Sequence, residues 1–223
     1  MNDPDTSLGE LRDLLRESLQ PIRTVPGPLL VTAGTALLVT CALAVFLSIK
    51  PLRFDRAALG AIGMWWLSIG QLVMAILLLA MAVRDTVPGF RPSRAQLGVG
   101  AGLAIAVHGG VTGLSWHRSP VALPETADAL SIGFYCHRVE LLAALPCVLL
   151  AALLASLGLS SRPLRLGFLL GAGSALAADS AWRLVCPISD PAHVIGAHSS
   201  ALLSAGLVGL LCMAVVQALR RRI

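Results

Sequence analysis

Long apolar runs, separated by short polar segments, dominate the sequence. The six runs are Leu29–Ile49, Ile62–Val83, Leu97–Trp116, Val139–Leu157, Leu166–Leu184 and Ser199–Leu219. Each approaches the ~20 residues that a membrane-spanning helix needs, and none alternates apolar and polar residues as a membrane β-barrel strand does. The pattern therefore predicts an all-α, polytopic membrane helix bundle with six transmembrane helices.

The composition supports a membrane protein over a soluble one. Of the 223 residues, 56% are hydrophobic and 13% are charged, and the mean hydropathy is +0.80. About a quarter of the residues in a soluble domain are charged, so this chain has too little polar surface for a water-facing globule. The positive residues behind the net charge of +5 cluster between the apolar runs, where they anchor helix ends at anionic headgroups. We therefore expect contact with the lipid bilayer and no direct contact with nucleic acid.

The distribution of basic residues predicts the orientation. With the N-terminus inside, the inner segments hold 11 Lys and Arg residues and the outer segments hold 6. Basic residues favour the cytoplasmic side, so we expect an N-in/C-in topology, although Lys50, Arg53 and Arg56 count against it. Two parts follow: a cytoplasmic leader over residues 1–28 and a transmembrane domain over residues 29–223.

The leader reads as a short amphipathic helix from Ser7 to Gln20. Ser7 and Glu10 match a capping box, and the apolar stripe at helical spacing consists of Leu8, Leu11, Leu15 and Leu19. An isolated helix this short is marginal in water, so its stripe needs a surface. The membrane, the protein's own inner loops and a partner's groove all remain open, and the nearly balanced charge of the polar face favours a partner.

The third and fifth runs are the weakest by hydropathy. The third is rich in glycine, and Gly98-x-x-x-Gly102 and Gly167-x-x-x-Gly171 have the spacing that lets membrane helices approach closely. The fifth carries Asp179 and Arg183, four residues apart on one helix face. We expect these two side chains to form an ion pair that neutralises both charges, with Glu140 joining them.

Two of the five cysteines stand apart from the others. Cys41, Cys147 and Cys212 lie within apolar runs and are most simply small core residues. Cys136 and Cys186 fall at the predicted outer ends of the fourth and fifth runs, beside polar residues. In an oxidising compartment such a pair forms either a constitutive disulfide or a switchable one, if the two helix ends are adjacent. The alternative is that they are two unrelated cysteines at the membrane interface.

Histidines near this cysteine pair make metal binding a further interpretation. They are His137, His193 and His198. Cysteine and histidine together provide a soft or borderline metal site. The chain shows no Ser-His-Asp order, no phosphate-binding loop and no H-E-x-x-H motif, so we do not expect an enzyme of those classes.

Three stretches, in order along nearly the whole chain, carry a resemblance to a known family. The first is Leu19-Gln20-Pro21-Ile22-Arg23, the second is Cys136 followed by Leu145-Pro146, and the third is Cys186-Pro187 with His193, His198, Gly206, Gly209 and Arg220-Arg221-Arg222. In this order they resemble the negative regulator of sigma-F family, six-span anti-sigma factors of the bacterial inner membrane. One departure is Ala197, where an aromatic residue is expected.

The resemblance implies a function that the residues alone only permit. It implies that the leader leucines hold an extracytoplasmic-function sigma factor at the inner membrane. It also implies that Cys136 and Cys186 are sensors of heavy metal or oxidant, with no resident cofactor beyond transient binding of the metal that acts as signal. Two other classes stay open from the residues: a membrane thiol-disulfide oxidoreductase, and a small metal transporter.

Overall fold

The structure is a computed structural model of the chain. It describes residue 13 and residues 27–86, 91–122, 128–156 and 162–220. The predicted leader stripe of Leu8, Leu11, Leu15 and Leu19 lies outside the described residues, so its role stays a prediction.

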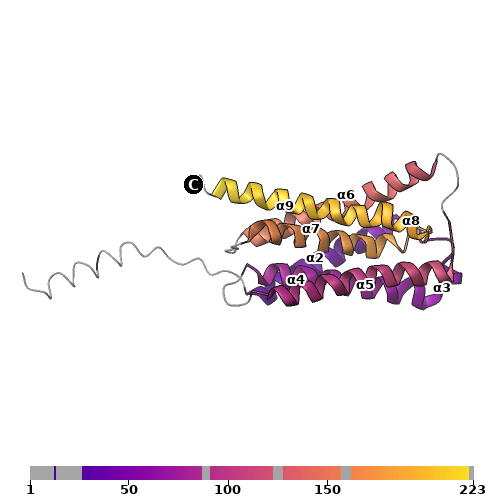
Figure 1. Cartoon of the computed structure of the whole chain (residues 1–223), viewed down its shortest axis with the longest axis horizontal. Helices are drawn as coiled ribbons and strands as arrows, with labels where there is room; N and C mark the ends of the chain where they lie inside the picture. Colours follow the sequence, from indigo (N-terminus) through magenta and orange to yellow (C-terminus); the bar gives the residue numbers. More distant parts are fainter. Residues whose placement is uncertain (1–12, 14–26, 87–90, 123–127, 157–161, 221–223) are drawn as a thin grey trace, which may run out of the picture.

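The described part of the chain is helical and contains no strand. Its elements are α2 (Pro28–Ile49), α3 (Arg56–Ala61), η1 (Ile62–Trp66), α4 (Leu67–Arg84), α5 (Arg94–Arg118), α6 (Asp128–Ser156), α7 (Pro163–Trp182), α8 (Pro191–His193), η2 (Val194–Ser199) and α9 (Ser200–Arg220). The long helices lie side by side as an elongated bundle (Figure 1). The all-α class predicted from the apolar runs is therefore confirmed.

Five helical stretches among the described residues are long and apolar enough to cross a membrane. They are Thr32–Ile49, Arg56–Arg84, Arg94–Arg118, Leu130–Leu150 and Pro191–Leu219. The remaining predicted span, the fifth run Leu166–Leu184, corresponds to α7, whose 20 residues make a helix of about 30 Å. A membrane protein is thus supported, while the count of six spans and the N-in/C-in orientation stay predictions.

The low hydropathy of α7 follows from its position at the centre of the bundle. The helix contacts α2, α4, α6 and α9, and most of its residues are buried, including the polar Ser174, Asp179 and Ser180. A helix that other helices cover on all sides has no need for side chains suited to lipid. The outer helices show the converse, because Ile105 in α5 and Leu211 in α9 are 73% and 62% exposed.

Two helices begin well before the apolar runs that predicted them. The run starting at Val139 belongs to α6, which begins at Asp128, and the run starting at Ser199 belongs to a helical stretch that begins at Pro191. Cys136 therefore lies within α6 and not just ahead of it. Hydropathy marks where a helix meets lipid, and a helix can continue into polar sequence beyond that point.

Glycines bring α7 and α9 into backbone contact. A Cβ atom on Gly167 would overlap the backbone of Gly209, and one on Gly171 would overlap the carbonyl of Ala205. The predicted close approach therefore exists at the Gly167-x-x-x-Gly171 pair. Gly98, of the other predicted pair, has open space where a Cβ would stand, so it makes no such contact.

Replacing Gly171 by alanine is expected to destabilise the bundle by about 1–3 kcal/mol, because α7 and α9 must move apart to admit the methyl group. Thermal unfolding of the purified protein in detergent measures the effect. The matched control is Gly98→Ala, where the methyl group meets no neighbour and alanine is the better helix former. Equal melting temperatures for Gly171→Ala and the unmodified protein would contradict the close packing.

Candidate functional site

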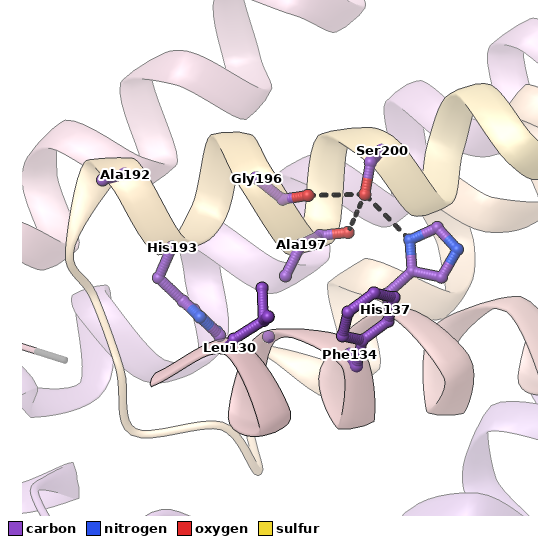
Figure 2. Close-up of a pocket in the computed structure, with 9 residues that line it drawn as sticks. Leu130, Phe134, His137, Ala192, His193, Gly196, Ala197 and Ser200 are labelled. Carbon is purple, nitrogen blue, oxygen red and sulfur yellow. Dashed lines mark hydrogen bonds between the residues drawn. The ribbon is translucent and has the colours of Figure 1, made fainter. Parts of the chain in front are cut away.

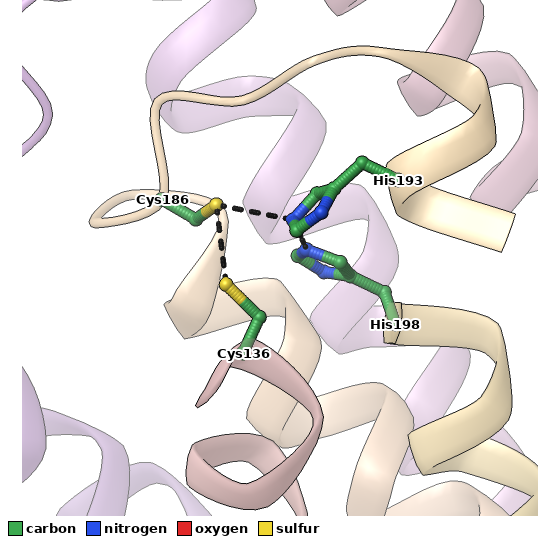
Figure 3. A group of neighbouring side chains, drawn as sticks. All are labelled: Cys136, Cys186, His193 and His198. Carbon is green, nitrogen blue, oxygen red and sulfur yellow. Dashed lines mark hydrogen bonds between the residues drawn. The ribbon is translucent and has the colours of Figure 1, made fainter. Parts of the chain in front are cut away.

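Four chemically reactive side chains converge at the end of the bundle opposite the C-terminus of α9 (Figures 1 and 3). Cys136 comes from α6, Cys186 follows α7, His193 ends α8 and His198 lies in η2. All four are buried, and one potential ligand atom from each lies within 4.8 Å of those of the others. We call this group the Cys2His2 cluster.

The two cysteines meet because the chain turns sharply after α7. The amide of Cys186 donates to the carbonyl oxygen of Trp182 at 2.7 Å, which closes the turn. Trp182 packs against the rings of Phe46 and Tyr135, with centroids 5.7 and 6.1 Å away. This aromatic contact holds the turn against α6, and the sulfur atoms of Cys136 and Cys186 then lie 3.8 Å apart.

A π-helical turn places the two histidines on one side of their helix. His193 and His198 are five residues apart, which in a regular α-helix would separate them by about 140° around the axis. The segment between them is η2, a π-helix, in which hydrogen bonds join residues five apart. The two rings consequently stack edge to face with centroids 5.0 Å apart, and their Nε2 atoms are 3.2 Å apart.

Arg53 fastens the loop that carries Cys186. The residue is 5% exposed. Its side chain donates hydrogen bonds to the carbonyl oxygens of Arg183 and Pro187 and to the hydroxyl of Ser189, at 3.3, 2.7 and 3.0 Å. The carboxylate of Asp55 accepts two more, at 2.5 and 2.7 Å. The positive charge of Arg53, which counted against the predicted topology, is therefore neutralised within the protein.

The pKa of Asp55 reflects this pairing. Burial raises the pKa of Asp55. The hydrogen bonds from Arg53 and Ser119 together lower it by more than burial raises it, so the pKa lies below the ordinary value of 3.8. A depressed carboxylate pKa stabilises the fold at higher pH, and this contribution is lost as the pH falls through the folded-state value. The Arg53 fastening is thus intact at neutral pH and weakens only in strong acid.

Asp179 supports the cluster from the centre of the bundle. Its Oδ1 accepts a hydrogen bond from Nδ1 of His198 at 2.7 Å. Arg183 donates from Nε at 3.2 Å, so the predicted ion pair is present in the structure. The side-chain amide of Gln71 also donates to this carboxylate, and Nδ1 of His108 lies 3.1 Å from it. Because Nδ1 of His198 carries the hydrogen, its Nε2 presents a lone pair to the cluster.

Two polar groups around His198 and His193 lack hydrogen-bond partners within the described part of the chain. Oε1 of Glu140 lies 2.6 Å from Nδ1 of His198, yet neither oxygen of this fully buried carboxylate has a partner of acceptable geometry. Asp179 is the acceptor with good geometry. Nδ1 of His193 also lacks a partner. Buried polar atoms are usually satisfied, so the site has unused capacity to bind a proton or a cation.

The surroundings of Cys186 favour its protonated thiol form. The adjacent sulfur of Cys136 raises its pKa, burial raises it further, and the nearby His193 and His198 lower it only in part, so the pKa lies above the ordinary value of 9.0. At neutral pH this thiol keeps its hydrogen. A reagent that binds thiolate must therefore displace the proton.

A cavity of about 340 Å³ lies beside the cluster, between α6 and the helical stretch from α8 to α9 (Figure 2). Phe134 contributes to its lining on the α6 side, and His193 reaches it from α8. His137 also lines the cavity, and its Nδ1 is 2.8 Å from the hydroxyl of Ser200. The structure therefore does not bring His137 into the Cys2His2 cluster, although the sequence placed it among the candidate ligands.

Sequence reasoning missed the residues that support the cluster from other parts of the chain. His108, Gln71 and Arg53 each contact the site or its loop from a position distant in sequence. Gln71 is a polar residue inside an apolar run, and Arg53 is a cation in a segment predicted to lie on the outer side, where basic residues are disfavoured. Each was an anomaly in its segment, and such anomalies in membrane proteins mark functional or structural polar contacts.

Comparisons with protein-family models, with curated proteins and with solved structures give no match to this chain. The chemistry of the site therefore rests on its own geometry, and the family resemblance stays an expectation.

Replacing Arg53 by methionine is expected to loosen the loop that carries Cys186. The loop loses three charged hydrogen bonds, and Asp55 loses its buried counter-ion. The alkylation rate of Cys186 in the native protein, followed by mass spectrometry, should rise about tenfold or more. Arg56→Met is the control because Arg56 is exposed. A rate for Arg53→Met equal to that of the control would contradict the fastening role.

Proposed function

We propose that this protein is a stress sensor of the bacterial inner membrane. In this proposal it sequesters an extracytoplasmic-function sigma factor through its N-terminal helix and releases it when Cys136 and Cys186 meet oxidant or heavy metal. The observation that carries the proposal is the buried pair of sulfurs, 3.8 Å apart, at the junction of α6, α7 and the helical stretch from α8 to α9. The sigma factor as partner rests on the family resemblance and on the leucine stripe of the leader.

The sulfur pair suits a switch because its oxidation changes the contact between helices. Two thiols that form a disulfide give two protons and two electrons to the oxidant, and the sulfurs must approach to about 2.05 Å. The resulting pull acts between α6 and the C-terminal end of α7. Since α7 contacts α2, α4, α6 and α9, a shift of its end is transmitted to most of the bundle.

The burial of the cluster favours a small signal over a protein substrate. Cys136 and Cys186 are 3% and 5% exposed, so a folded substrate protein has no access to either sulfur. The cavity lined by His193 is large enough to bring a metal ion or a small oxidant next to one member of the cluster. These features match a sensor, whose signal needs only to reach the sulfurs.

Release of the sigma factor requires that its affinity for the two states of the sensor differ greatly. Moving a sigma factor from 99% held to 99% free needs about 5.5 kcal/mol between the two states of the sensor. A disulfide contributes a term of about 2–4 kcal/mol, and thiolate–metal binding can contribute more. The leucine stripe at Leu8, Leu11, Leu15 and Leu19 is the segment that would lose affinity, because it is the part long enough to fill a partner's groove.

A membrane thiol-disulfide oxidoreductase is a second candidate, and one observation favours it. The sequence has no C-x-x-C pair, but the fold creates a close pair from Cys136 and Cys186. Such an enzyme must pass electrons between a substrate thiol and a quinone. Oxidation of a dithiol by the purified protein with added quinone would establish it, and the burial of both sulfurs counts against it.

No comparable observation supports the third candidate function, a small metal transporter. Of the cysteines within apolar runs, Cys147 is buried, Cys212 is half-buried and Cys41 is exposed. Neither group of potential metal ligands in the described part of the chain includes any of them. We therefore do not propose transport.

Deletion of residues 1–24 is expected to abolish capture of a sigma factor from the host cytoplasm by the detergent-solubilised protein. The intact chain should retain one, identified by mass spectrometry. A finer pair of variants separates the stripe from the rest of the leader: Leu11→Ser with Leu15→Ser should lose capture, and Arg12→Gln with Arg16→Gln should keep it. Capture by the deleted form, or by neither form, contradicts the sigma-binding role of the leader.

The double substitution Cys136→Ser, Cys186→Ser is expected to abolish the response of the sigma-dependent transcripts to diamide and cadmium in cells. The transcripts are measured before and after exposure, at matched protein levels in the membrane. Cys147→Ser is the control because this buried cysteine lies outside the cluster. A normal response in the double variant would remove the cysteine pair as the sensor.

A further inference from the structure

We infer that the Cys2His2 cluster is a resident zinc site, in which Sγ of Cys136 and Cys186 and Nε2 of His193 and His198 are the four ligands. The proposed function treats metal only as a passing signal, whereas this inference gives the resting sensor a bound ion. It deepens the sensor half of the proposed function and is independent of the sigma factor.

The spacing of the ligand atoms matches a tetrahedral zinc site. Zinc binds thiolate sulfur at about 2.3 Å and imidazole nitrogen at about 2.0–2.1 Å, with four ligands at tetrahedral angles. These values place two sulfurs about 3.8 Å apart, two nitrogens about 3.3 Å apart, and a sulfur and a nitrogen about 3.6 Å apart. The structure has 3.8 Å between the sulfurs, 3.2 Å between the nitrogens, and 3.7 Å from Cys186 Sγ to His193 Nε2 (Figure 3).

The surroundings are those of a metal site. A ligating histidine usually donates its second ring N–H to a carboxylate, which orients the ring. His198 does so to Asp179 at 2.7 Å, and Glu140 lies on the same side of the ring at 2.6 Å. Two facing Nε2 atoms at 3.2 Å need either one shared hydrogen or one shared cation between them, and a cation also satisfies both cysteines.

The ligand set points to zinc among the common cations. Two sulfurs and two imidazole nitrogens in tetrahedral arrangement favour zinc, while oxygen ligands favour calcium or magnesium. Two thiolates neutralise Zn²⁺, so the buried site carries no net charge. Four protein ligands leave no open position, which is typical of structural zinc and not of catalytic zinc.

A second group of potential ligands, Glu140, Asp179 and His198, is a weaker candidate. Asp179 already accepts from Arg183 and from Gln71, and the guanidinium repels a second cation. The sulfur side of His198 has no such competitor among the described residues.

A zinc ion at this position makes the sensor responsive to both kinds of stress. Diamide takes two electrons from the two thiolate ligands and two protons from water and becomes the hydrazine. The two Zn–S bonds break, an S–S bond forms between Cys136 and Cys186, and Zn²⁺ leaves. A more thiophilic ion such as Cd²⁺ displaces zinc without electron transfer. Both events change the same junction: the disulfide keeps α6 joined to the end of α7 but releases His193 and His198, and the larger Cd²⁺ lengthens the bonds to all four ligands.

Metal analysis of the full-length protein, purified in detergent without added metal, tests the inference. We expect about one zinc ion per chain, and loss to background in Cys186→Ser and in His198→Ala. His117→Ala and Cys147→Ser are matched controls that should keep the ion, since neither residue belongs to the cluster. Diamide should release the zinc of the unmodified protein to a chromogenic chelator.

Cobalt substitution of the unmodified protein keeps the test valid if the ligand variants fail to fold. Co²⁺ should give the visible d–d bands of a tetrahedral ion and thiolate-to-cobalt charge-transfer bands, and Zn²⁺ should erase both. Absence of zinc together with absence of these bands overturns the inference, as does zinc that survives in the cysteine and histidine variants. Neither result bears on capture of a sigma factor, so the two proposals fail separately.

Discussion

The buried carboxylate of Asp179 is the constraint around which the rest of the structure is arranged. A charge at the centre of a membrane bundle is costly unless it is paired and hydrogen-bonded. Four helical elements supply partners: Gln71 from α4, His108 from α5, Arg183 from the end of α7 and His198 from η2. The need to satisfy one carboxylate therefore brings these elements to the same point.

The same carboxylate orients one of the side chains of the Cys2His2 cluster. By accepting from Nδ1 of His198, Asp179 turns the Nε2 lone pair toward the sulfurs. The π-helical turn then aligns His193 with His198, and Arg53 holds the loop that places Cys186 against Cys136. The cluster and its structural support thus share residues, and under the proposed function these shared contacts would carry a change at the sulfurs to the centre of the bundle.

Much of the fold was predictable from the sequence because membrane helices are recognisable by their length and their apolar composition. The run Leu97–Trp116 lies inside α5, and the run Leu166–Leu184 nearly coincides with α7. The starts of α6 and of the stretch to α9 were misplaced, because hydropathy reports contact with lipid and not the end of a helix. The number of spans and the orientation stay predictions, because the length and composition of a helix do not by themselves place it in a membrane.

The site was predictable in part. The cysteine pair and its neighbours His193 and His198 were singled out by their position at predicted helix ends. His137 was grouped with them because it adjoins Cys136 in sequence, yet adjacent residues of a helix point in different directions. The alignment of His193 with His198 depends on a π-turn, for which α-helical periodicity gives no signal. The contacts of Gln71, His108 and Arg53 join distant segments that a single sequence does not relate.

The measurement that tests the central claim most directly is the equilibrium affinity of the full-length protein, in a lipid nanodisc, for its captured sigma factor in two states of the cysteine pair. The reduced form should bind far more tightly than the form with a Cys136–Cys186 disulfide, up to about 10⁴-fold for a complete switch. Equal affinities in the two states would show that the sulfur pair does not control the leader, and would contradict the account.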